Sequence, residues 1–263
     1  MVHKKIIVFD MDETLGYFVQ FGIFWDALQE YFNHNLTDND FFQVLDKYPQ
    51  LLRPNIMSIL KYIKRKKDKG QLSHVYIYTN NQGPKSWVTS IKNYIEYKLS
   101  YKIFDKVIAA YKVHNKLVEK CRTTHQKTVS DLLKCTKLSS NVKICFIDDQ
   151  YHPLMESDNT TYINIKPYQY DIPFKTLTKK FLTTELGKNI KEDKVYFKKF
   201  IEYFVSQYDY QVMLKNKSDL KMDNIASKRM MYFIQDFFKS DHSPKTLKKR
   251  KNSIKKTRKR RYY

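Results

Sequence analysis

Several polar side chains of the sequence have the types and spacing needed to act together on a phosphate group. In chain order they are Asp10, Asp12, Thr14, Thr79, Asn80, Lys127, Asp148 and Asp149. Transfer of a phosphoryl group needs a nucleophile, a proton donor and positive charge that neutralises the phosphate oxygens. Carboxylates alone would repel a phosphate, but Mg²⁺ binds readily to one or two carboxylates together with water and phosphate oxygens. These residue types therefore predict Mg²⁺-dependent phosphoryl chemistry.

Each group has its own task in such a reaction. Asp10 and Asp148 would share the Mg²⁺, and Lys127 would hold the remaining negative charge of the phosphate. Asp12 can protonate the leaving oxygen and then deprotonate the attacking water. An Asp-x-Asp-x-Thr pattern alone is a weak signal. It becomes strong here because an apolar run precedes it and a second apolar run ends in two aspartates about 130 residues later.

Five short apolar runs must place these side chains. They cover residues 5–9, 74–78, 106–110, 143–147 and 160–165. The stretches between them carry apolar residues at helical spacing, a pattern typical of βαβ units with a mostly parallel sheet. Ligand sites in open parallel sheets lie beyond the carboxyl ends of the strands, so the polar residues that follow these runs are expected to meet there.

A helix is expected to begin near Thr128, because Thr128 and Asp131 have the spacing of a capping box ahead of an apolar stripe. Lys127 immediately precedes that helix, and for this reason we prefer it as the cation of the site. Lys112 and Lys116 also follow the third apolar run and remain alternatives.

The segments FDMDETLG, YIYTNN and CFIDD, together with Lys127, resemble the four motifs of the haloacid-dehalogenase (HAD) superfamily of Mg²⁺-dependent phosphohydrolases. The Asp-Glu-Thr-Leu form, followed by Arg53 and Pro54, is similar to the RNA polymerase II C-terminal-domain phosphatases and NLI-interacting-factor-like phosphatases, an FCP-like subgroup. The segment at Thr79 looks more like that of polynucleotide 3′-phosphatases. The Lys-rich chain is also similar to uncharacterised HAD-like proteins of large nucleocytoplasmic DNA viruses. The resemblance covers about residues 4–170.

This resemblance implies a Rossmann-like sheet in which the strand before Asp10 lies between the strands that end at Thr79 and Asp148. It implies that Asp10 is the nucleophile and forms an aspartyl-phosphate. Asp12 would be the general acid and base and would lend its backbone carbonyl to the metal. Because members that lack this second aspartate tend to catalyse other reactions, hydrolysis of a phosphate ester is the favoured reaction.

The resemblance also assigns the remaining groups of the site. Thr79 and Asn80 would bind the phosphate through a hydroxyl and an amide, and Lys127 would be the cation of the third motif. Asp148, with Asp149 directly or through water, would complete the Mg²⁺ site.

The expected organisation is an α/β domain over residues 1–174, a helical appendage over 175–242 and a disordered basic tail over 243–263. Within the first, residues 16–73 would form a small cap or linker insertion, which is short for a large cap and favours an open site. The tail carries 11 Lys and Arg residues and no acid, half of the net charge of +22. Such a tail favours either contact with nucleic acid or recognition by an importin, and the third interpretation is that its charge only keeps the protein in solution.

The cysteines Cys121, Cys135 and Cys145 lack CxxC spacing, so we expect neither a disulfide nor a zinc site. This favours an intracellular location, in the cytoplasm or nucleus, of a host cell if the protein is viral. No apolar run approaches the roughly 20 residues that a membrane span needs, and we expect a monomer. The scattered histidines, among them His125 and His152, are expected to be non-catalytic.

Together these features predict a Mg²⁺-dependent phosphatase that hydrolyses phosphate monoesters, with a phosphoprotein or a nucleic-acid 3′-phosphate as substrate. The alternative is a catalytically inactive HAD-fold module that binds nucleic acid or protein.

Overall fold

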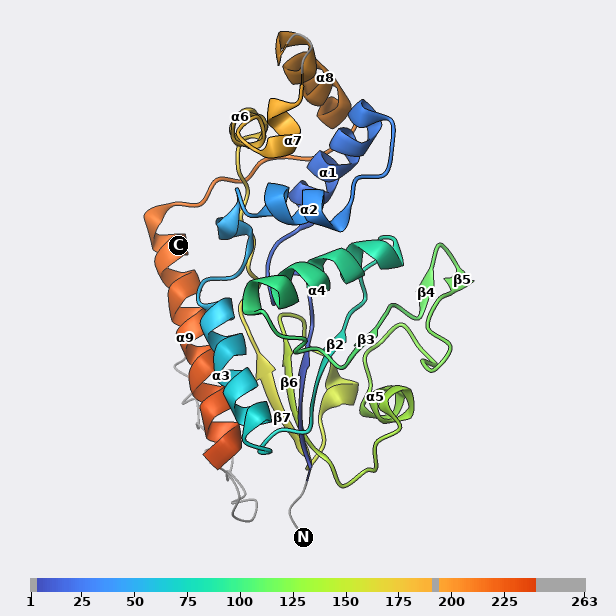
Figure 1. Ribbon diagram of the computed structural model, residues 1–263. Coiled ribbons are helices and arrows are strands. Elements are labelled where there is room, and N and C mark those ends of the chain that lie inside the picture. Colours follow the sequence, from blue (N-terminus) through green and yellow to red (C-terminus); the bar gives the residue numbers. More distant parts are fainter. Residues whose placement is uncertain (1–3, 191–193, 240–263) are drawn as a thin grey trace, which may run out of the picture.

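The computed structural model describes residues 4–190 and 194–239, and its centre is a five-stranded parallel sheet with the order β3-β2-β1-β6-β7 (Figure 1). The strands are β1 (Lys5–Phe9), β2 (His74–Tyr78), β3 (Lys106–Ile108), β6 (Lys143–Asp148) and β7 (Thr160–Asn164). All four neighbouring pairs are parallel. The predicted α/β class and the position of β1 between β2 and β6 are confirmed.

Strand β1 is central because its side chains are apolar on both faces. Ile7 and Phe9 enter one hydrophobic cluster, Ile6 and Val8 enter another, and all four are fully buried. Burial of each such side chain stabilises the fold by roughly 1.5–3 kcal/mol. The first cluster includes residues of the helices α3 (Ile56–Asp68) and α4 (Lys85–Leu99), and the second includes residues of α5 (Val129–Thr136).

A second group of helices lies beyond the carboxyl end of the sheet (Figure 1). It consists of α1 (Val19–Phe32), α2 (Asp38–Leu45), the short η1 (Pro49–Leu51), α6 (Phe174–Phe181), α7 (Glu185–Lys188) and α8 (Lys194–Ser206). Aromatic side chains join α1 to the later helices: the ring of Tyr31 lies 4.8 Å from that of Phe197, and Phe24 lies 5.9 Å from Phe181. Helices from the two ends of the chain therefore share one core.

The long helix α9 (Lys217–Lys239) runs beside α3 on the flank of the sheet (Figure 1). The rings of Tyr62 and Phe238 lie 6.0 Å apart, and Lys5 donates a hydrogen bond to the carbonyl of Phe237. No helix within the described ranges is both long and apolar enough to cross a membrane. The basic tail at 243–263 lies outside the described residues.

Two local features differ from the sequence-based expectation. At the start of α5, Thr128 caps the helix by accepting a hydrogen bond from the backbone N–H of Asp131. The Asp131 carboxylate, however, accepts from the backbone and hydroxyl of Thr123, so only half of the expected capping box forms. In addition, the segment after β3 contains an antiparallel hairpin of β4 (Lys112–Val113) and β5 (Lys116–Leu117) that the apolar pattern did not predict.

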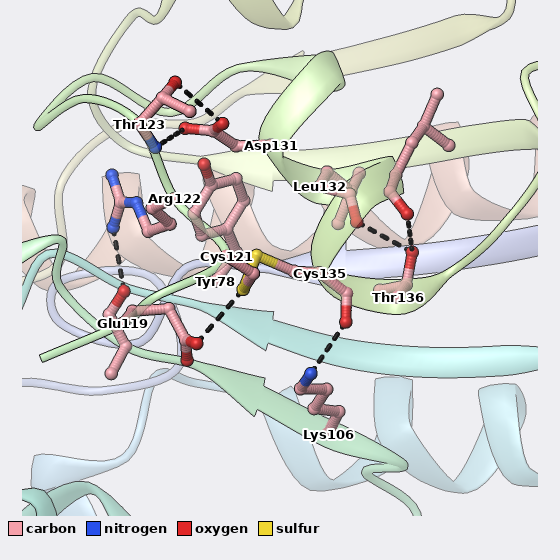
Figure 2. The surroundings of a disulfide bond; sticks show 12 residues. Tyr78, Lys106, Glu119, Cys121, Arg122, Thr123, Asp131, Leu132, Cys135 and Thr136 are labelled. Atoms are coloured by element: carbon pink, nitrogen blue, oxygen red, sulfur yellow. Dashed lines mark hydrogen bonds between the residues drawn. A yellow bond between two sulfur atoms is a disulfide. The ribbon is translucent and has the colours of Figure 1, made fainter.

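The prediction that the cysteines form no disulfide is wrong. Cys121 and Cys135 are bonded, with their Cα atoms 5.1 Å apart, and Cys145 is free and buried in β6 (Figure 2). The loop before α5 folds back on that helix and brings Cys121 to its last turn, although 14 residues separate the two in sequence. No recognisable spacing encodes such a pair. The cysteines therefore give no support to a reducing compartment.

Candidate active site

The carboxylates of the first and last motifs meet at the carboxyl edge of the sheet. Asp10 follows β1 and Asp148 ends β6, and the backbone N–H of Asp10 donates to the carbonyl of Ile147, 2.9 Å away. This pairing of adjacent parallel strands holds the two side chains at the same level. Asp10, Asp148 and Asp149 each offer a carboxylate oxygen, and these oxygens lie within 4.8 Å of one another.

Lys127 places its ammonium group between the first two carboxylates. Its Nζ lies 2.5 Å from Oδ1 of Asp10 and 2.6 Å from Oδ2 of Asp148, and only 2% of the side chain is exposed. Burial favours the neutral amine, but the negative charges of Asp10 and Asp148 outweigh burial and raise the pKa of Lys127. The side chain therefore stays cationic. Of the three candidate lysines, Lys127 is the one that contacts the carboxylates. Lys112 and Lys116 lie in the β4–β5 hairpin instead.

Asp12 lies on the same strand end and is held by an amide. Nδ2 of Asn81 donates to Oδ2 of Asp12 over 2.8 Å. Burial raises the pKa of Asp12, and the hydrogen bond from Asn81 offsets only part of that effect. A raised pKa favours the protonated carboxyl group, the form that can act as a general acid.

The segment after β2 is arranged differently from the motif-based assignment. The hydroxyl of Thr79 accepts a hydrogen bond from the backbone N–H of Asn81, and Oδ1 of Asn80 accepts one from Arg122. It is Asn81, one residue later, that reaches toward Asp12. Thr79 is buried close to the end of β2, whereas the Asn80 side chain is directed to Arg122.

Arg122 is a buried residue that the sequence did not reveal. Its guanidinium donates hydrogen bonds to the carbonyls of Thr79, Ala109, His125 and Gln126 and to the side chain of Asn80. It follows Cys121, so the disulfide lies beside it (Figure 2). Arg122 thereby fastens the segment after β2 to the loop that carries Lys127. No motif surrounds it in the sequence, and its role depends on the fold of that loop.

A second buried arginine supports the first motif. Nε of Arg53 donates to the carbonyl of Thr14 over 2.6 Å, and Nη2 donates to the carbonyl of Glu13. Glu13 adopts a positive φ of 56°, a conformation that costs free energy for a residue with a side chain. These bonds fix the turn in that strained form. The hydroxyl of Thr14 then donates to Asp149 over 2.9 Å, which links the first motif to the last.

His152, which we expected to be non-catalytic, contacts the same cluster. Its Nε2 lies 3.4 Å from Oδ2 of Asp148. Burial alone would raise the pKa of Asp148, but the hydrogen bond from His152 and the charge of Lys127 outweigh burial and lower it. His152 therefore helps to keep Asp148 ionised. In the sequence, the only indication of this contact is that His152 follows Asp148 by four residues.

The charges of the cluster are suited to a divalent cation. Burial, with the negative charges of Asp148 and Asp12, raises the pKa of Asp10 to about 8 despite the opposing effect of Lys127. Burial also raises the pKa of Asp149 to about 6. If all three carboxylates are ionised, a single lysine leaves negative charge uncompensated, and a divalent cation would neutralise it. Three hard oxygen donors close together, with excess negative charge, are the kind of site that Mg²⁺ prefers.

No family model, curated protein or solved structure matches the chain. The functional inference therefore depends on the residues and geometry of the site itself.

The raised pKa of Asp10 predicts how stability changes with pH. From its ordinary value near 3.8 up to about 8, folded Asp10 holds a proton that the unfolded chain has lost, so stability falls as pH rises through this range. We expect the metal-free protein to lose about 1–2 kcal/mol of unfolding free energy between pH 6 and pH 8. Urea unfolding in EDTA measures this loss.

Added Mg²⁺ and the Asp10→Asn variant test whether Asp10 causes this pH dependence. Mg²⁺ should restore more stability at pH 8 than at pH 6, because it competes with fewer protons for the carboxylates. Asp10→Asn should remove most of the pH dependence. A metal-free stability that stays constant or rises from pH 6 to pH 8 would contradict the raised pKa.

Proposed function

We propose that the chain is a HAD-type, Mg²⁺-dependent phosphatase that hydrolyses phosphate monoesters through Asp10. The observation that carries this proposal is the convergence of Asp10, Asp148 and Asp149 within 4.8 Å, with Lys127 bonded to the first two. A buried lysine among carboxylates at the carboxyl edge of a parallel sheet matches the chemistry that phosphoryl transfer needs.

In the first step, a carboxylate oxygen of Asp10 attacks phosphorus, and the bond from phosphorus to the substrate oxygen breaks. That oxygen takes the proton of Asp12, whose raised pKa suits it to be the donor. Asp10 must be ionised to attack. A Mg²⁺ ion held by Asp10, Asp148, Asp149 and the backbone carbonyl of Asp12 would favour the ionised form and neutralise phosphate charge.

In the second step, water attacks phosphorus and gives its proton to Asp12. The bond between phosphorus and Asp10 breaks, inorganic phosphate leaves, and the enzyme returns to its starting state. Lys127 keeps its positive charge throughout and offsets the negative charge beside Asp10. Thr79 and the neighbouring backbone would hold the phosphate oxygens in place.

The substrate classes that we propose are a phosphoprotein and a nucleic-acid 3′-phosphate. The basic sequence at 243–263 adds nucleic acid or an importin as proposed partners, and a cytoplasmic or nuclear location in the host cell if the protein is viral. The proposed phosphatase activity depends on the cluster of carboxylates and not on the substrate, the partners or the location.

Hydrolysis of p-nitrophenyl phosphate by the full chain tests the proposal. We expect turnover with millimolar Mg²⁺, loss of turnover in EDTA and recovery when Mg²⁺ is added back. Lack of turnover with Mg²⁺, combined with salt-sensitive nucleic-acid binding, would contradict the enzyme and favour the binding module.

A further inference from the structure

A cavity of about 600 Å³ lies between α1, α2 and the beginning of α4. Its volume is within the range of roughly 300–1,000 Å³ that is usual for ligand sites. None of Asp10, Asp148 or Asp149 lines it, so it is separate from the carboxylate cluster. It nevertheless reaches the candidate site through Asn81, which lines the cavity and donates its hydrogen bond to Asp12.

One wall of the cavity is aromatic. Trp25 and Trp87 line it, and Phe41 lies between them, with its ring 5.0 Å from that of Trp25 and 5.6 Å from that of Trp87. Gly22 lines the cavity against this wall, and a Cβ there would lie 3.4 Å from Cζ2 of Trp87. Trp25 and Phe41 are buried, whereas Trp87 is only partly buried, and aromatic surface of this kind binds apolar and aromatic groups with little loss of conformational entropy.

The charge of the cavity is opposite to that of the chain. The chain has a net charge of +22, but the described residues that line the cavity include Asp26 and Asp38 and no lysine or arginine. A polyanion would therefore meet two carboxylates and no compensating cation. An apolar group accompanied by a basic side chain would meet complementary surfaces.

We propose that this cavity binds the part of the substrate next to the phosphate, and that the substrate is a phosphorylated peptide segment with an apolar and a basic side chain. The inference rests on the proposed function, because the carboxylate cluster sets the position of the phosphate. Asn81 connects Asp12 to the cavity, so the leaving oxygen that takes the proton of Asp12 would face the cavity. A nucleic-acid end would place further phosphates against Asp26 and Asp38.

Tryptophan fluorescence tests this proposal directly, because both tryptophans of the sequence line the cavity. The full chain with Asp10→Asn, which prevents turnover, is titrated with Mg²⁺ present at physiological salt. The probes are a phosphoserine hexapeptide with one Phe and two Arg, the same peptide with Glu in place of Arg, and a 3′-phosphorylated thymidine hexamer.

We expect the Arg peptide to change the emission and to bind about tenfold more tightly than the Glu peptide, because each exposed charge contributes a modest screened interaction. The hexamer should leave the emission unchanged. An emission change with the hexamer at equal or lower concentration, or none with either peptide, would overturn the proposal.

Two variants in the cavity and one control variant locate the effect. Asp26→Lys should abolish or reverse the preference for the Arg peptide, whereas Asp158→Lys, which adds the same charge just before β7 at the other edge of the sheet, should preserve it. Gly22→Leu should weaken binding of the Arg peptide at least tenfold by filling the cavity. Gly22→Leu is combined with Asp10→Asn for this titration.

The two proposals fail in different ways. If the wild-type chain does not hydrolyse p-nitrophenyl phosphate with Mg²⁺, the proposed function fails, whatever the titrations show. If it does, but Asp26→Lys and Asp158→Lys have equal peptide preferences, the cavity assignment alone fails. Should Gly22→Leu not fold, the comparison of the two lysine variants decides the question.

Discussion

Asp10→Asn should lower the turnover of p-nitrophenyl phosphate by about 10⁴-fold or more, because an amide cannot supply the anionic oxygen that attacks phosphorus. Asn has nearly the same shape, and Lys127 keeps its contact with Asp148, so the fold should be preserved. The measurement is kcat at saturating Mg²⁺, with circular dichroism as a check of folding.

Asp158→Asn is a suitable control, since it removes the same charge from an exposed position before β7. Its kcat should equal that of the wild type. An Asp10→Asn enzyme with more than a tenth of the wild-type kcat would exclude Asp10 as the nucleophile.

Lys127→Met should reduce both stability and activity. Without the ammonium group, Asp10 and Asp148 remain buried side by side and must take up a proton or repel each other. We expect a loss of about 2–4 kcal/mol in the unfolding free energy of the metal-free protein, measured by urea at pH 7.5. We also expect a fall in kcat of about 10²–10³-fold, because the fixed positive charge near the phosphate is lost.

Lys64→Met provides the matched control. Lys64 pairs with Asp68 on the surface of α3, 2.7 Å away, and both side chains are about a third or more exposed. Loss of such a pair should cost less than about 1 kcal/mol and leave kcat unchanged. If Lys127→Met is as stable and as active as Lys64→Met, the buried cation has neither of the roles assigned to it.

The parts of the fold set by apolar runs were predictable. Residues 5–9 and 74–78 are strands with the predicted bounds because buried parallel strands consist of uninterrupted apolar residues. The convergence of Asp10 with Asp148 followed from the same pattern, since adjacent parallel strands end at one edge. The choice of Lys127 over Lys112 and Lys116 depended on its position before a helix.

Features that depend on loop conformation were not predictable. Cys121 and Cys135 meet because the loop before α5 turns back, and Arg122 gains its partners through the same turn. That Asn81 contacts Asp12 while Asn80 contacts Arg122 follows from the directions of the two side chains after β2. The loop before α5 and the segment after β2 have no hydrophobic periodicity that would fix their conformation. Their contacts are therefore known only from the structure.

The central claim is that Asp10 accepts the phosphoryl group, and detection of that covalent state tests it most directly. The Asp12→Asn variant, which should form the intermediate faster than it hydrolyses it, is mixed with p-nitrophenyl phosphate and Mg²⁺, quenched in acid and digested for peptide mass spectrometry. We predict that the peptide containing Asp10 gains the mass of one HPO₃ group and that hydroxylamine removes it. Turnover without a phosphorylated peptide, or with the group on another residue, would contradict the account.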